Sequence, residues 1–284
     1  MDKSILRHLH NLPCFKQVEK VTPISAGLSS HCYQVFADKQ YYFVKKVIMT
    51  NEITVAKDAA LNELSPKVIY HDNQWLITEY IGSENLLNHH KTLNEKIAIS
   101  TKLMARCHQL KTQIDLFKPA KVIDDLINKS PSAIQESKEL FVLIKSITAQ
   151  LNLKNNLVCC HGDINFSNIL INKENSTWLV DFECVTLAPA EYDLAMFIAV
   201  NNLARDKISR VVEHYQSDSI LIIDESRLHN YLHYCYLINA LWYTNAAMNN
   251  ASSELKQLAQ QQWNKLQLHV KMHNDIQGMI SSIL

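Results

Sequence analysis

The segment VCCHGDINFSNIL, residues 158–170, gathers polar side chains that could carry out chemistry together. His161, Asp163 and Asn168 lie in a turn between two apolar runs, and Asp181 closes the next apolar run. Magnesium prefers oxygen ligands and takes one or two of them from the protein. An amide oxygen from Asn168 and a carboxylate from Asp181 would meet that need. A second carboxylate that stays off the metal can accept a proton from an alcohol that attacks phosphorus.

The elements around this segment must bring its residues together. Residues 168–172 and 177–182 are short apolar runs typical of strands, and the polar residues 173–176 between them favour a hairpin turn. Such a hairpin would place Asn168 at the start of one strand, beside Asp181 at the end of the other.

The first eighty residues predict several strands and one helix. The expected strands cover residues 21–27, 31–37, 41–49, 67–72 and 74–81. Helical spacing covers residues 51–64 and stops before Pro66. From Asn85 onward the pattern is helical, and residues 93–111 form an amphipathic helix. This change predicts a domain boundary, with residues 1–82 as one lobe and 83–284 as another.

Composition excludes several classes of protein. Lys plus Arg equal Asp plus Glu at 28 each, so no global charge would attract nucleic acid or acidic lipid. Residues 228–253 contain no charged residue, but His, Asn and Thr recur there, so a buried helix is expected rather than a membrane span. The N-terminus does not resemble a signal peptide, which predicts a cytoplasmic protein. The seven cysteines show no framework spacing and are expected to be reduced, mostly in the core.

The pattern HxDxxxxN followed by DFE resembles the catalytic loop and metal segment of the protein-kinase-like superfamily. HGD with DFE, rather than HRD with DFG, is similar to the aminoglycoside phosphotransferase and choline kinase branch. This resemblance implies an α+β, two-lobed protein-kinase-like fold, with a small antiparallel sheet and one helix in the N-terminal lobe and a larger, mainly helical C-terminal lobe. It also implies that Asp163 is the catalytic base, that His161 braces the loop, and that Asn168 and Asp181 bind Mg²⁺.

Other segments extend the resemblance to the nucleotide site. Residues 24–35, ISAGLSSHCYQV, resemble the nucleotide loop of choline kinases, which implies that Gly27 and Ser29 lie near the phosphates of ATP. FVKKV resembles the kinase VAIK segment and makes Lys45 the expected phosphate contact. Lys46 is the alternative, because a shift of one residue reverses the face of a strand.

Two further segments complete the expected nucleotide site. NEITVAKDAALNELSPKV, residues 51–68, resembles the choline kinase helix whose glutamate, here Glu52, holds the lysine in line. ITEYIG, residues 77–82, resembles the hinge between the lobes, near residues 78–82. There the backbone of Glu79, Tyr80 and Ile81 would bind adenine.

The resemblance also implies a small cationic alcohol as the acceptor, because kinases of this branch act on small hydroxylated amines. Helical spacing places Tyr231, Tyr234 and Trp242 on one face, and aromatic faces attract quaternary ammonium groups. Such a stripe is also typical of a helix packed in a core. Glu183, together with Asp163, would supply negative potential for the cation.

The sequence therefore predicts an ATP- and Mg²⁺-dependent kinase that phosphorylates choline or ethanolamine. The alternatives are a thiamine kinase, an aminoglycoside-type antibiotic phosphotransferase and a non-catalytic nucleotide-binding kinase-like module. A protein kinase is disfavoured because HGD lacks the arginine and no APE segment is present. The sequence leaves four points open: the acceptor alcohol, the choice between ATP and GTP, the number of magnesium ions and the oligomeric state.

Overall fold

The computed structural model describes residues 3–24, 31–47, 49–154 and 156–284. In this part of the chain, an antiparallel sheet forms near the N-terminus and the C-terminal part is mainly helical, which confirms the expected α+β class. The chain divides into two compact units, Met1–Asp115 with His161–Thr186 and Leu116–Cys160 with Leu187–Leu284. The first unit thus extends past the boundary expected at residue 82 and includes the polar turn around Asp163.

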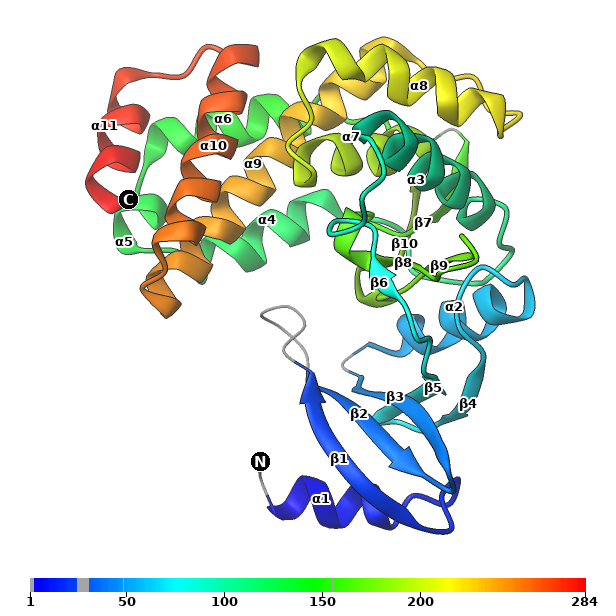
Figure 1. Ribbon diagram of the computed structural model, residues 1–284. Helices are drawn as coiled ribbons and strands as arrows, with labels where there is room; N and C mark the ends of the chain where they lie inside the picture. The colour runs from blue at the N-terminus through cyan, green and yellow to red at the C-terminus, as the bar shows by residue number, and fades with distance from the viewer. Residues whose placement is uncertain (1–2, 25–30, 48, 155) are drawn as a thin grey trace. The chain divides into compact units, whose positions relative to one another are not determined.

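Five strands of the first unit form one antiparallel sheet in the order β1-β2-β3-β5-β4 (Figure 1). They are β1 (Val18–Ile24), β2 (Cys32–Ala37), β3 (Gln40–Lys46), β4 (Val68–His71) and β5 (Trp75–Glu79). The expected strands are therefore present with shifted ends. Register pairs Val44 of β3 with Tyr33 on one side and Ile77 on the other, so β3 lies between two strands with its backbone paired on both edges.

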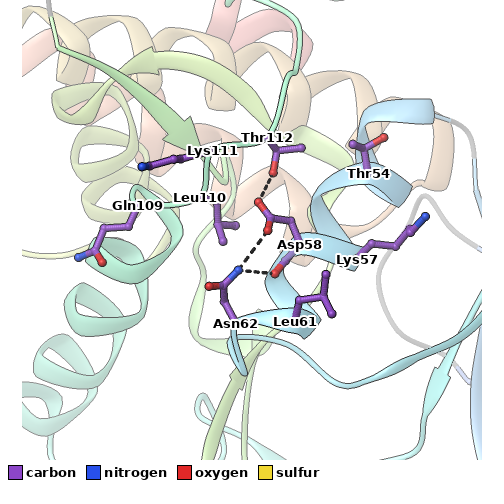
Figure 2. A pocket seen from close by; sticks show the side chains of 9 residues that line it. All are labelled: Thr54, Lys57, Asp58, Leu61, Asn62, Gln109, Leu110, Lys111 and Thr112. Atoms are coloured by element: carbon purple, nitrogen blue, oxygen red, sulfur yellow. Dashed lines mark hydrogen bonds between the residues drawn. The ribbon is translucent and has the colours of Figure 1, made fainter.

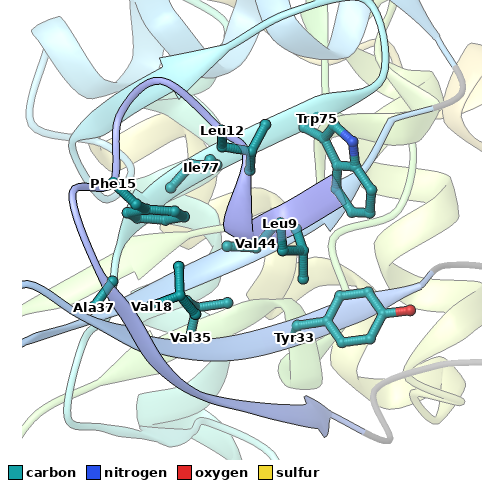
Figure 3. Packing of buried hydrophobic residues seen from close by; sticks show 10 residues of the cluster. All are labelled: Leu9, Leu12, Phe15, Val18, Tyr33, Val35, Ala37, Val44, Trp75 and Ile77. Carbon is teal, nitrogen blue, oxygen red and sulfur yellow. The ribbon is translucent and has the colours of Figure 1, made fainter. Parts of the chain in front are cut away.

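One face of this sheet is covered by the N-terminal segment. Figure 3 shows Leu9, Leu12 and Phe15 against Val35 and Val44, and all five side chains are buried. The expectation of one helix in this region is wrong, because helix α1 (Lys3–His10) precedes the sheet. An eight-residue helix has few positions to show a period, and it forms here because it can cover the apolar face of the sheet.

Helix α2 (Thr50–Leu61) is the helix expected between β3 and β4. Its buried residues Glu52, Val55, Ala56 and Ala59 recur at intervals of three and four, so one face is turned inward. This face packs against β4 and against the short turn η2 (Phe182–Cys184). Glu52 is a carboxylate in an otherwise apolar stripe, which calls for a buried partner.

A three-stranded sheet carries the polar turn. Its order is β6-β8-β9, with β6 (Glu84–Asn85), β8 (Ile169–Ile171) and β9 (Thr177–Leu179), and the turn η1 (Phe166–Asn168) leads into β8. The antiparallel β8–β9 pair confirms the expected hairpin. Helix α3 (Leu93–Cys107) begins with a capping box between Thr92 and Glu95.

The second unit is built mainly from helices. They are α4 (Pro119–Ile127), α5 (Ser132–Gln135), α6 (Lys138–Thr148), α7 (Ala190–Val200), α8 (Ile208–Ser217), α9 (Glu225–Asn250), α10 (Ser253–His269) and α11 (Asn274–Ile283), with the turn η3 (Arg205–Lys207). A two-stranded sheet, β7 (Leu157–Cys160) with β10 (Thr186–Pro189), completes it. Helix α9 packs against both α7 and α10.

Helix α9 contains the long uncharged run of the sequence. No helix in the described ranges combines the length and the apolar character needed to cross a membrane. One of its buried hydroxyls accepts a hydrogen bond from a neighbouring helix: the Trp263 indole donates to Thr244 Oγ1 at 3.2 Å. All seven cysteines are free thiols, and five of them are buried, in agreement with the expected reduced core cysteines.

Candidate active site

Lys45 is the centre of an ion cluster in the first unit. Successive side chains of a strand point to opposite faces, so Lys45 lies on the face opposite to Val44, which packs under α1. Its Nζ atom lies 2.6 Å from Glu52 Oε1, 2.5 Å from Asp181 Oδ1 and 3.0 Å from Glu183 Oε2. Lys45 and Glu52 are 4% and 2% exposed. One ammonium group therefore holds together carboxylates from a helix and from the segment after β9.

The cluster keeps Lys45 charged. Burial by itself would lower the pKa of the ammonium, but the adjacent Asp181 and Glu52 carboxylates outweigh it and raise the pKa above its ordinary value. Burial raises the pKa of Glu52, and the Lys45 charge opposes that effect. Lys46, the alternative phosphate contact, is exposed at the end of β3. The structure brings Lys45 into this cluster, not Lys46.

Gly162 allows a close backbone approach at the turn. Its φ angle is 80°, in the left-handed region, and a Cβ atom there would lie 2.3 Å from the carbonyl oxygen of Cys184. The adjacent His161 joins the same two segments, because its Nε2 lies 3.0 Å from the Val180 carbonyl oxygen and its Nδ1 accepts from the Asp163 N–H at 3.3 Å. With Nδ1 as the acceptor, Nε2 is the nitrogen that can donate to the Val180 carbonyl oxygen. His161 is thus in a position to brace the turn.

Asp163 is held by amide groups and not by a cation. Its Oδ2 accepts from Asn165 Nδ2 and from Asn168 Nδ2, each at 3.1 Å. Burial raises the pKa of the carboxyl to about 7; the Asn165 and Asn168 hydrogen bonds act against this, while the negative charges of Asp181 and Glu183 add to it. Among the described residues Asp163 forms no ion pair. A carboxyl group of this kind can exchange a proton near neutral pH.

Asp181 lies in a left-handed backbone conformation beside Asn168. Its φ and ψ angles are 70° and 66°, a left-handed conformation that is uncommon for residues other than glycine, asparagine and aspartate. The Val180 N–H donates to the Asn168 carbonyl oxygen at 3.0 Å, so the hairpin brings the two residues together as the sequence predicted.

The oxygen donors here suit a hard divalent cation. The side chain of Asp181 is 32% exposed and that of Glu183 is 25% exposed, so both are accessible to solvent. Together with Glu52 they place three carboxylates on the single positive charge of Lys45. This excess of negative charge, together with the oxygen ligands available from Asn168 and Asp181, fits magnesium.

The expected adenine segment follows β5. The side chain of Glu79 accepts from the Lys67 N–H at 2.9 Å and thus fixes the edge of the sheet, so only its backbone is a candidate for nucleotide contact. The Tyr80 N–H donates to the Tyr41 carbonyl oxygen at 3.3 Å, and the Ile81 carbonyl oxygen accepts from Ser83. Gly27 and Ser29, the expected phosphate-loop contacts, lie outside the described residues.

The aromatic residues expected to face a cationic substrate lie in different environments of the second unit. Tyr231 and Tyr234 on α9 are fully buried. Their hydroxyls donate to the carbonyl oxygens of Asn152 and Pro119 at 3.2 and 3.1 Å. Trp242 is 41% exposed. Tyr231 and Tyr234 therefore pack as core residues, which is the alternative that the helical period also allowed.

Two features of the site were not expected from the sequence. Glu183 was assigned to the substrate, but its carboxylate contacts Lys45. Asn165 was not singled out, yet its Oδ1 accepts from the Asn168 N–H at 3.0 Å while its amide donates to Asp163. An asparagine before a turn commonly bonds the backbone ahead of it, and that signal could have identified Asn165.

A five-stranded antiparallel sheet with a buried lysine–glutamate pair, followed by a turn with Asp163 and Asn168 and a hairpin ending in Asp181, defines a protein-kinase-like phosphotransferase fold. The sequence model of the phosphotransferase enzyme family (APH) matches residues 20–228. The chain belongs to this family.

Solved structures of the same fold cover nearly the whole chain. A choline/ethanolamine kinase family protein from Mesorhizobium loti has a TM-score of 0.68 at 17% identity, covering 99% of this chain and 98% of that one. Choline kinase from Cryptosporidium parvum has a TM-score of 0.71 at 14% identity, with 100% and 98% covered. Spectinomycin phosphotransferase in complex with ADP and spectinomycin has a TM-score of 0.62 at 17% identity, with 98% of each chain covered. Comparison with curated proteins gave no significant match.

Proposed function

We propose that this protein is an ATP- and magnesium-dependent kinase that phosphorylates the hydroxyl group of a small cationic alcohol, with choline and ethanolamine as the first acceptors to test. Membership of the phosphotransferase family supports the reaction class. The similar structures of choline and ethanolamine kinases, and one that holds ADP, support the choice of substrates.

The observation that carries this proposal is the separation of Asp163 from the Lys45 cluster. Lys45 holds Glu52, Asp181 and Glu183, whereas the Asp163 carboxylate accepts hydrogen bonds from the amides of Asn165 and Asn168 and has a pKa raised by burial to about 7. A group with a pKa near the working pH is suited to general base catalysis. The site thus provides a basic carboxylate and, apart from it, a fixed cation.

Each side chain has a role that follows from its contacts. Asp163 would accept the proton of the acceptor hydroxyl, and Asn165 and Asn168 would orient its carboxylate. Lys45 would bind phosphate oxygens, with Glu52 fixing the direction of its ammonium group. Transfer by such a site depends on position and charge neutralisation and requires no covalent enzyme intermediate.

The remaining nucleotide contacts are assigned by resemblance. Magnesium held by Asn168 and Asp181 would supply charge neutralisation at the phosphates. The backbone of Glu79, Tyr80 and Ile81 would bind adenine.

Asp163→Asn tests the assignment of the base. The substitution keeps a side chain that can accept hydrogen bonds from Asn165 and Asn168 but cannot take a proton, so turnover should fall by about a thousandfold. ATP affinity, measured by calorimetry, should change by less than about threefold because Asp163 lies outside the Lys45 cluster. Asp218→Asn, at an exposed position, is the matched control. Retained turnover in the Asp163 variant would contradict the role of the base.

The acceptor is tested by coupled ADP release against choline, ethanolamine, thiamine, spectinomycin and other antibiotics, and a protein substrate. We expect turnover with choline or ethanolamine. Preference for thiamine or an antibiotic would support the kinase reaction but contradict the proposed acceptor. Nucleotide binding without turnover on any acceptor would favour the non-catalytic module, and absence of nucleotide binding would overturn the proposal.

A further inference from the structure

Residues 106–115, the last two residues of helix α3 and the segment after it, form hydrogen bonds with helix α2 and its C-terminal cap. At the C-terminal end of α2, Arg106 Nη2 donates to the carbonyl oxygens of Asn62 and Glu63 at 2.8 and 2.9 Å. In the middle, Thr112 Oγ1 donates to Asp58 Oδ2 at 2.5 Å. The segment thus runs antiparallel to the helix.

The same segment reaches the first turn of α2 and the chain beyond Glu183. Asn51 Nδ2 donates to Asp115 Oδ2 at 3.0 Å, one residue before Glu52. The Asp115 carbonyl oxygen accepts from Thr186 Oγ1 at 3.0 Å. Because Glu52 and Glu183 both contact Lys45, the segment is bonded next to the elements that supply these two partners of the lysine.

The Asp58–Thr112 contact joins a side chain of α2 to residues 106–115. Figure 2 shows it beside a pocket of about 570 Å³ that lies between α2 and residues 109–112. Asp58 accepts two hydrogen bonds: Oδ2 from Thr112 Oγ1, and Oδ1 from Asn62 Nδ2 at 3.1 Å. The bond from Thr112 joins α2 to residues 106–115 between the contacts of Arg106 and Asn51.

Glu52 depends on the position of α2. It lies on the same helix, six residues before Asp58, and its carboxylate is 2.6 Å from Lys45 Nζ in a buried environment. A displacement of α2 by about 1 Å would lengthen that contact. Misplacing a catalytic group by such a distance can lower the reaction rate by about a hundredfold.

We propose that Asp58 and Thr112 are positioning residues, which fix α2 from its outer side and so keep Glu52 on Lys45. The inference rests on the proposed kinase function for its kinetic consequences, but the control of α2 itself is independent of that function.

Thr112→Val removes the hydroxyl donor and keeps the shape of the side chain. We expect the KM for ATP to rise and kcat to fall, with kcat/KM lower by about tenfold, as for the loss of one hydrogen bond to a charged acceptor. Thr112→Ser restores the donor and should recover most of the activity. Asp58→Asn, which weakens the same bond, should lower kcat/KM in the same direction.

Thr54→Val is the matched control. Thr54 lies on the same helix and lines the same pocket, but among the residues that the structure describes its hydroxyl donates only to the Thr50 carbonyl oxygen of its own helix, at 3.3 Å. Its substitution should leave kcat/KM within about twofold of the parent. An equal decrease in kcat/KM for Thr54→Val and Thr112→Val would overturn the proposal, because it would show that any substitution lining this pocket lowers kcat/KM.

A double-mutant cycle with Glu52→Gln separates positioning from general stability. If Thr112 acts through Glu52, Thr112→Val should have little further effect on kcat/KM once Glu52 is replaced. A full additional tenfold loss in the Glu52→Gln background would contradict the proposed route.

Hydrogen exchange of the α2 backbone amides tests the inference without any turnover. These amides should exchange about tenfold faster in Thr112→Val than in the parent, and at an unchanged rate in Thr54→Val. Unchanged α2 exchange in Thr112→Val would overturn the proposal. If the parent itself neither binds ATP nor turns over any acceptor, the proposed function fails, and the exchange result still decides whether Thr112 controls α2.

Discussion

The Nζ atom of Lys45 lies 2.6 Å from Oε1 of Glu52, and both side chains are almost completely buried. A buried charge without a partner destabilises the folded state, so each of these two charged groups stabilises the other. This pair fixes the relation between β3 and α2, and the same ammonium group reaches Asp181 and Glu183.

Replacing Lys45 by Met should therefore both weaken nucleotide binding and destabilise the fold. We expect a loss of about 3 kcal/mol in unfolding free energy, since Glu52 would remain buried without its counter-charge. Urea unfolding measures this loss. Lys46→Met, at the exposed next position of the same strand, is the control and should change stability by less than about 0.5 kcal/mol. A larger effect at Lys46 than at Lys45 would reverse the assignment of the phosphate contact.

The rate should depend on pH through Asp163. Burial raises the pKa of this carboxyl to about 7, and a general base acts only when it is ionised. On the acid side, kcat/KM should thus fall by about tenfold for each pH unit below that value. The measurement is a pH–rate profile of the free enzyme with ADP release as the readout. A profile that stays flat down to pH 5 would exclude Asp163 as the base.

Gly162→Ala should disrupt the turn. The new Cβ would meet the Cys184 carbonyl oxygen at 2.3 Å, and φ of 80° is unfavourable for alanine. We expect a loss of about 3 kcal/mol or more, measured by thermal unfolding. Gly278→Ala is the matched control: it lies within helix α11 with no atom within 4 Å of the added Cβ, and it should be neutral or slightly stabilising. Equal melting temperatures for the two variants would contradict this account of the turn.

The second unit should lose stability in mild acid through His233. Its ring on α9 lies 5.6 Å from the ring of His269 on α10. Burial lowers the pKa of His233 to about 4, with His269 and His229 adding to the effect. The unfolded chain binds the proton at a higher pH than the folded chain, so the contribution of neutral His233 is present above about pH 6.5 and is lost as the pH falls toward 4.

The expected size of that loss is about 1 kcal/mol between pH 7.5 and 5, since His233 is partly exposed. Urea unfolding at the two pH values measures it. In His233→Gln the loss should shrink by that amount, because glutamine does not titrate. An unchanged pH dependence in the variant would show that other groups are responsible.

Local patterns predicted much of the first unit. The β8–β9 hairpin follows from two apolar runs around a polar turn, and it places Asn168 beside Asp181 as expected. Resemblance to the kinase VAIK segment indicated Lys45 as the phosphate contact, with Lys46 as the alternative because neighbouring side chains of a strand take opposite faces. Such features depend on residues close in sequence, so they can be read without knowing the fold.

Contacts between distant residues could not be read in this way. The helical period of α9 allows Tyr231 and Tyr234 to face either a ligand or a core, and only the packing of the second unit places them in its interior. Glu183 is adjacent in sequence to the metal segment, yet its partner is Lys45, 138 residues away.

By itself, the sequence determined the α+β class, the main strands and helices, and the polar residues around Asp163, because hydrophobic period and turn chemistry act locally. The tertiary structure decided which lysine is buried, which carboxylates share its charge, and how residues 106–115 are bonded to α2. These features depend on how elements distant in sequence pack together. The free energy of burying a charge depends on the partners that this packing places around it.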